Sequence, residues 1–187
     1  MSNGDVALAT KASTMNDRAI ETDMKNLEIA VAADPDNAEL KAALDARKSD
    51  RLADQVVEAQ KRVDQNPTDP QLRFELGSAL YHSGDHSAAI PHLQQATRNP
   101  HIRTRVLLML ARTFKAKGMF DLAIKQLSDA LADLVAMDNT KKEVLYEKGL
   151  IHSEVGDKAA ALDCFKQIYE VDYGYRDVAT RVESSYV

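Results

Sequence analysis

A stretch of 34 residues recurs three times within residues 70–175, and this recurrence constrains the fold more than any other feature of the chain. The units span residues 70–103, 104–137 and 142–175, with four residues inserted before the third. Each unit carries a glycine and, five residues later, an alanine at the same place. These residues are Gly84, Gly118 and Gly156, and Ala89, Ala123 and Ala161. Such a period indicates stacked supersecondary units, each of which buries its apolar side against its neighbours.

Apolar residues recur at helical spacing on both sides of each of these glycines. In the second unit, Leu107, Leu110 and Phe114 form one stripe before Gly118, and a second stripe follows it. The pattern predicts two helices joined by a short turn in every unit. The composition agrees, because Ala and Leu dominate an apolar fraction of 44% and β-branched residues are sparse, which favours helices over sheets.

Small residues also recur inside the first predicted helix of each unit, at Gly77, Ala111 and Gly149. Together with the three repeated alanines, they are expected to let the two helices of a pair approach closely. The whole pattern resembles the tetratricopeptide repeat family, in one phase across all three units. The matching residues are Leu76, Gly77, Gly84, Ala89, Leu93, Ala96, Leu107, Leu110, Ala111, Phe114, Gly118, Phe120, Ala123, Ala130, Leu145, Gly149, Gly156, Ala161 and Phe165. The resemblance implies an all-α fold, a right-handed superhelical solenoid of antiparallel helix pairs.

The N-terminal third of the chain is less regular. Residues 1–15 are expected to form a flexible leader, and residues 16–69 to hold N-terminal helices with a degenerate repeat. Within residues 37–65, Ser49 and Asp50 could begin a second helix, but a single continuous helix is nearly as well supported because no glycine separates the two halves. We favour the degenerate repeat, since a stacked helix pair buries more apolar area.

The C-terminal residues, 176–187, are expected to form one more helix. Val178, Val182 and Tyr186 would lie on one face of it, with charged residues opposite. A terminal repeat needs a cover whose outer side is polar, so we interpret this helix as a cap on the third unit.

Composition excludes several classes of function. The net charge of −5, from 24 basic and 29 acidic residues, argues against a nucleic-acid-binding protein, which needs a basic surface. No apolar run approaches the roughly 18 residues of a membrane span, so no membrane partner is expected. Residues 1–15 lack the features of a signal peptide, and the single cysteine, Cys164, cannot form an internal disulfide. A cytoplasmic location is therefore expected.

No catalytic or metal-binding pattern stands out in the sequence. His82 and His86 are four residues apart, but the predicted turn lies between them, and no cysteine or carboxylate completes a ligand set with His92. Nothing near Cys164 supplies the base that a catalytic thiol needs. The chain is accordingly predicted not to be an enzyme and to hold no cofactor or metal.

The resemblance implies that the first helix of each pair lines the concave groove of the solenoid. Two aromatic residues of this lining flank a basic centre, and arginine can bind carboxylates through two hydrogen bonds, so a partner of acidic character is expected. The positions carried over from the family are Gln71, Phe74, Ser78, Tyr81, Arg105, Leu108, Arg112, Lys115, Glu143, Tyr146 and Leu150.

The sequence therefore predicts a protein–protein interaction scaffold that binds a peptide or partner protein in its concave groove. One alternative is a homo-oligomerising structural module, in which the groove or the N-terminal helix takes up another copy of the chain. A remote alternative is a regulatory domain of a larger protein.

Overall fold

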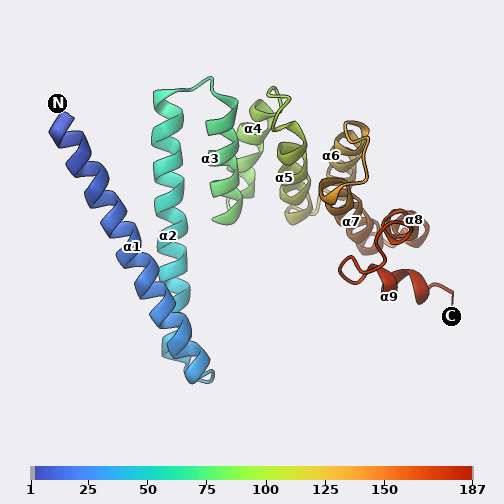
Figure 1. The fold of residues 1–187 in the computed structure, drawn as a ribbon, viewed down its shortest axis with the longest axis horizontal. Coiled ribbons are helices and arrows are strands. Elements are labelled where there is room, and N and C mark those ends of the chain that lie inside the picture. The colour runs from blue at the N-terminus through green and yellow to red at the C-terminus, as the bar shows by residue number, and fades with distance from the viewer. Residues whose placement is uncertain (1–2, 187) are drawn as a thin grey trace. The chain divides into compact units, whose positions relative to one another are not determined.

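The computed structural model describes the backbone of residues 3–186, together with the side chains of Met15 and residues 19–186 (Figure 1). This part of the chain is helical and contains no strand. The chain splits into two compact units, Met1–Gln55 and Val56–Val187, and the boundary between them falls inside one helix. The helices are α1 (Asn3–Ala33), α2 (Ala38–Gln65), α3 (Pro70–His82), α4 (His86–Ala96), α5 (Arg103–Ala116), α6 (Phe120–Ala132), α7 (Asn139–Glu154), α8 (Lys158–Tyr169) and α9 (Val178–Glu183).

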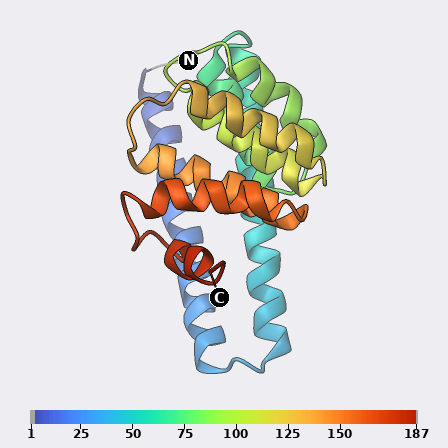
Figure 2. The ribbon, with the colours of Figure 1, turned by 90° about the vertical axis from the view of Figure 1, so that its right-hand side faces the viewer.

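The first unit is a helical hairpin made of α1 and the N-terminal part of α2. The two segments run antiparallel from the turn at residues 34–37 (Figure 2). The side chain of Asn37 begins α2, because its Oδ1 accepts hydrogen bonds from the backbone N–H groups of Glu39 and Leu40, both at 3.1 Å. An ion pair of 3.2 Å between Arg47 and Asp23 links the two segments.

The structure differs from the sequence-based expectation in this N-terminal region. Residues 38–65 form one uninterrupted helix in place of the expected helix pair (Figure 1). The physical reason is that the segment contains no glycine or proline, so Ser49 and Asp50 sit among good helix formers and nothing breaks the hydrogen-bonded ladder. Helix α1 begins at Asn3, within the stretch expected to be a leader.

The second unit stacks three helix pairs along the chain, α3 with α4, α5 with α6, and α7 with α8 (Figure 1). Each second helix also packs against the first helix of the next pair, which makes the stack a solenoid. At the turns, Gly84, Gly118 and Gly156 have φ values of +89°, +72° and +85°. Side chains rarely adopt this left-handed backbone, so the recurring glycines follow from the turn geometry.

Gly77 and Gly149 are small for a different reason, the close approach of two helices. A Cβ atom added at Gly77 would lie 2.7 Å from Cγ of Leu93 on α4, and one added at Gly149 would lie 2.7 Å from Cε1 of Phe165 on α8. Both distances are far below van der Waals contact. The expectation that small residues allow the helices of a pair to approach is confirmed at these two positions.

A continuous row of buried aliphatic side chains fills the space between the pairs. Leu76, Leu93, Leu110 and Leu127 are each 1% exposed or less. Burial of such side chains stabilises the fold by about 1.5–3 kcal/mol each, so the stack depends on every pair being covered by its neighbour.

Helix α9 packs on α8 at the end of the second unit. Its Val178 and Val182 are buried, as their spacing predicts, and join the cluster around Leu145 and Ile168. Tyr186 lies beyond the end of α9 and is exposed, with Nζ of Lys166 at 4.9 Å from its ring centroid. The helix is shorter than the expected range of 176–187 because its hydrogen-bonded turns begin only at Val178 and end at Glu183.

Candidate functional site

The residues carried over as groove-lining lie on α3, α5 and α7, and we call the surface they form the first-helix surface. Phe74 on α3 and Arg105 on α5 are brought together there, with the guanidinium carbon of Arg105 at 5.1 Å from the ring centroid of Phe74. The ring itself is buried, and Arg105 is exposed above it. This arrangement is a cation–π contact that holds the arginine against the surface while its N–H groups face solvent.

Arg112 and Glu143 also meet across this surface, and a third residue joins them. Nη2 of Arg112 donates hydrogen bonds of 2.7 Å to Glu143 and 2.9 Å to Glu147, so α5 is tied to α7. Burial alone would lower the pKa of Arg112, but the hydrogen bonds and charges of Glu147 and Glu143 outweigh it and raise the pKa. The basic centre expected from sequence is thus largely neutralised from within the chain.

Lys115 also forms an ion pair with α7, since its Nζ lies 3.0 Å from a carboxylate oxygen of Glu154. Glu147 and Glu154 were not among the site residues predicted from the sequence. The signal was present, because Glu147 follows Glu143 by four residues and therefore projects from the same face of a helix. What the sequence could not supply was the register that sets α7 against α5.

Tyr146, which was expected to line the groove, is buried in the structure. Only 8% of it is exposed, because it packs edge-on against Phe165 and Tyr175. Arg176 covers the ring, with its guanidinium carbon 4.5 Å from the ring centroid. The hydroxyl donates a 2.7 Å hydrogen bond to Asp177, so Tyr146 anchors the segment before α9.

The remaining predicted residues differ in how much they offer to a partner. Leu108 is buried, whereas Ser78, Tyr81 and Leu150 are half-buried. The ring of Tyr81 lies beside the imidazoles of His82 and His86, each with a centroid distance of 5.2 Å. Of the three cations on the first-helix surface, Arg112 and Lys115 are paired with glutamates of α7. Arg105 is the one for which the described part of the chain provides no carboxylate partner.

The candidate histidines lie on α3 and α4, and the single cysteine lies on α8. Nδ1 of His92 lies 3.0 Å from Nη1 of Arg73, and no group of three His, Cys, Asp or Glu side chains among the described residues is arranged to hold a metal ion. Cys164 is buried on α8, and this burial raises the pKa of its thiol.

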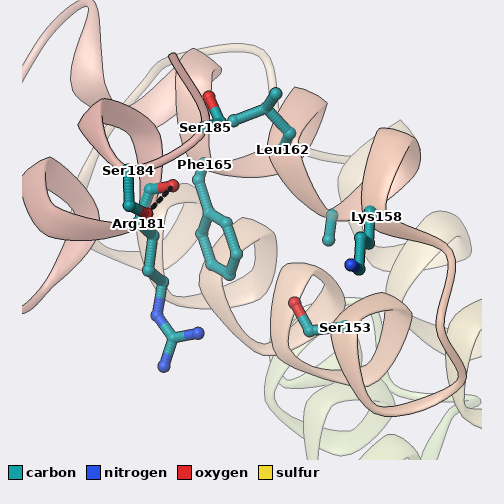
Figure 3. A pocket seen from close by; sticks show the side chains of 8 residues that line it. Ser153, Lys158, Leu162, Phe165, Arg181, Ser184 and Ser185 are labelled. Carbon is teal, nitrogen blue, oxygen red and sulfur yellow. Dashed lines mark hydrogen bonds between the residues drawn. The ribbon is translucent and has the colours of Figure 1, made fainter. Parts of the chain in front are cut away.

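A hollow lies at the C-terminal end of the second unit, between α7, α8 and α9 (Figure 3). Its volume is about 550 Å³, within the range of ligand pockets. The hollow was not predictable from the sequence, because its walls come from three helices and from the residues after α9. It is lined by Ser153, Lys158, Ala161, Leu162, Phe165, Arg181, Ser184 and Ser185.

Comparison with known proteins identifies the family. Two models described as tetratricopeptide repeat match the chain, one over residues 37–101 and the other over residues 142–175. The chain belongs to the tetratricopeptide repeat family. The second match covers the same residues as the third 34-residue unit, and the first takes in the whole of α2, the region with the degenerate pattern. A comparison with curated sequences gives no match.

Solved structures show that the helical arrangement is one known for this family. The crystal structure of MamA aligns with a TM-score of 0.57 and 21% identity, over 100% of this chain and 98% of that one. YrrB, described as a TPR protein with an unusual peptide-binding site, aligns with a TM-score of 0.61 and 15% identity, over 96% of this chain and 89% of that one. These likenesses establish the all-helical solenoid predicted from the sequence.

A third similar structure is that of a complex. The Yersinia enterocolitica type III secretion chaperone SycD, bound to a peptide of the translocator YopD, aligns with a TM-score of 0.51 and 21% identity, over 61% of this chain and 89% of that one.

Within residues 3–186 of the present protein, no helix is both long and apolar enough to cross a membrane.

Proposed function

We propose that this tetratricopeptide repeat protein is a protein-interaction scaffold that binds an acidic peptide segment on its first-helix surface, with Arg105 as the recognising cation. The observation that carries the proposal is the state of Arg105. It is exposed, it is held over the ring of Phe74, and its N–H groups are not engaged by a carboxylate of the described residues.

The chemistry of the arginine favours an acidic partner. A planar guanidinium can donate two parallel hydrogen bonds to a carboxylate. Because the ring beneath it already restricts the arginine side chain, little of its conformational entropy is lost on binding. Arg112 and Lys115 contribute less to recognition, because their charges are already paired with Glu143, Glu147 and Glu154.

The fold supports binding by preorganisation. The three helix pairs are fixed to one another by two apolar clusters, both of which Leu131 contacts, and by the ion pairs between α5 and α7. The surface therefore loses little freedom when a flexible segment docks. Two of the similar structures, YrrB and SycD, are described with peptide binding, which agrees with this use of the fold.

Binding of paired synthetic peptides to the full-length chain tests the proposal. Peptides rich in Asp and Glu are compared with the same peptides carrying Asn and Gln, for the wild type, Arg105→Glu and Lys125→Glu. Lys125 is an exposed cation on the second helix α6 and serves as the matched control. We expect the acidic peptides alone to bind, and Arg105→Glu to weaken binding roughly tenfold or more, as loss of a charged hydrogen bond does.

Unchanged binding by Arg105→Glu, or an equal loss in Lys125→Glu, would contradict the proposal. Size-exclusion chromatography with mass measurement, made at several protein concentrations, separates the alternative. A concentration-dependent dimer that Arg105→Glu abolishes would make the partner a second copy of this chain.

A further inference from the structure

The hollow between α7, α8 and α9 is lined by apolar side chains, by two cations and by serine hydroxyls. Its floor is apolar, formed by Ala161, Leu162 and the ring of Phe165. Two cations stand at its sides, with Arg181 on one side of Phe165 and Lys158 on the other (Figure 3). No carboxylate belongs to the lining residues, although the protein as a whole is acidic.

The two cations differ in how free they are. Arg181 donates through Nε to Asp177 at 2.9 Å, and its guanidinium lies 5.1 Å from the ring centroid of Phe165, so its position is fixed by the fold. Lys158 is exposed at the first position of α8 and forms no ion pair with a described residue. The ammonium of Lys158 is therefore available to a negatively charged group that enters the hollow.

The serine hydroxyls of the hollow favour a ligand that carries hydrogen-bond donors as well as a negative charge. Ser153 donates its hydroxyl proton to the carbonyl of Gly149, and Ser184 donates to the carbonyl of Arg181. Ser185 donates to the carbonyl of Val182 at 2.6 Å. Because each hydroxyl proton is donated to a backbone carbonyl, these oxygens keep lone pairs that can accept hydrogen bonds from N–H groups of a ligand.

We propose that this hollow binds the C-terminal residue of a polypeptide that ends in a large apolar side chain. The side chain lies on the floor formed by Leu162 and Phe165, the terminal carboxylate pairs with Lys158, and the last backbone N–H groups donate to the serine oxygens. The proposal does not rest on the first-helix surface, because the hollow uses residues of α7, α8, α9 and the segment after α9, and Arg105 lies on α5.

The probe is the dipeptide N-acetyl-Ala-Phe with a free carboxylate, compared with the same dipeptide as its C-terminal amide. Binding to the full-length, isotope-labelled chain is followed by amide chemical shifts in two-dimensional NMR. We expect saturable shifts at Lys158, Leu162, Phe165 and Ser184 with the acid, and roughly tenfold weaker binding with the amide, the effect of one charged hydrogen bond.

Variants identify the groups responsible. Lys158→Gln is expected to weaken binding of the acid to the level of the amide, whereas Lys125→Gln on α6 leaves it unchanged. Because Lys158 is exposed and forms no ion pair with a described residue, its replacement does not threaten the fold, and the NMR spectrum of the free variant checks this directly. Equal affinity for acid and amide, shifts confined to other residues, or no saturable shifts with the acid would each overturn the proposal.

Discussion

The hydroxyl of Tyr146 on α7 donates a 2.7 Å hydrogen bond to the carboxylate of Asp177, the residue that precedes α9. Burial, followed by the hydrogen bond and charge of Asp177, raises the pKa of Tyr146. The pKa of Asp177 is lowered, first by its hydrogen bond from Arg181 and then by that from Tyr146. The pair thus ties the C-terminal segment to the third helix pair.

We expect Tyr146→Phe to lower the free energy of unfolding by about 1 kcal/mol, the usual net contribution of one such hydrogen bond. Chemical denaturation measures the change, and Tyr173→Phe, at an exposed tyrosine, is the control that should stay at the wild-type value. The lowered pKa of Asp177 means that its contribution is present above the ordinary carboxyl pKa and is lost as the pH falls through the folded-state pKa. An equal loss in the Tyr173 variant would contradict the assignment.

Gly77→Ala tests the close approach of α3 and α4. The added methyl group would meet Cγ of Leu93 at 2.7 Å, so Leu93 or the helix must shift, and we expect a loss of about 1–3 kcal/mol in the free energy of unfolding. Gly174→Ala is the matched control, because the nearest atom to its added Cβ is 3.8 Å away. A Gly77 variant as stable as the control would show that the two helices are not held at this distance.

The Arg112–Glu147 pair should be energetically coupled. In a double-mutant cycle with Arg112→Gln and Glu147→Gln, we expect a coupling of about 0.5–1 kcal/mol that decreases at high salt. The exposed pair Lys125–Asp129 on α6 provides the comparison. We expect that pair to give about 0.3–0.5 kcal/mol, since it is the more solvent-screened of the two. A smaller coupling for Arg112–Glu147 than for Lys125–Asp129 would be evidence against the tie between α5 and α7.

His92 should make the fold sensitive to mild acid. Burial and then the charge of Arg73 lower its pKa, because protonation would place two cations within 3.0 Å. As the pH falls below about 6.5, the unfolded chain takes up the proton before the folded chain does, so stability decreases. His92→Gln should therefore lose less stability between pH 7.5 and pH 5.5 than the wild type does, as followed by urea denaturation at both pH values. His101→Gln, at an exposed position between α4 and α5, is the control and should keep the wild-type pH dependence of stability. If His101→Gln weakened that dependence and His92→Gln did not, the role given to His92 would be contradicted.

The recurring residues made the helix pairs predictable, and the reasons are local. Gly118 and Gly156 are required by a left-handed turn, and Gly77 and Gly149 by the distance between two helices, so each leaves a mark in the sequence at a fixed interval. The continuous helix at residues 38–65 was harder to predict. Whether Ser49 and Asp50 interrupt it depends on a balance of small local preferences, which no single residue reveals.

The candidate site was predictable only as a set of positions. Sequence placed Phe74, Arg105, Arg112 and Tyr146 on first helices, and the structure keeps them there. Their exposure and pairing depend on neighbours that are distant in the chain, Glu147 for Arg112 and the segment before α9 for Tyr146.

The amino-acid sequence by itself determined the repeat, the helix pairs and the glycine turns, because helical periodicity and backbone conformation are properties of short segments. Only the tertiary structure decided which charges are neutralised and which stay free. Arg105 keeps its charge open to solvent, Arg112 does not, and Lys158 faces a hollow walled by three helices. The physical reason is that electrostatic pairing and cavity shape depend on the register between helices, which packing sets and no local pattern encodes.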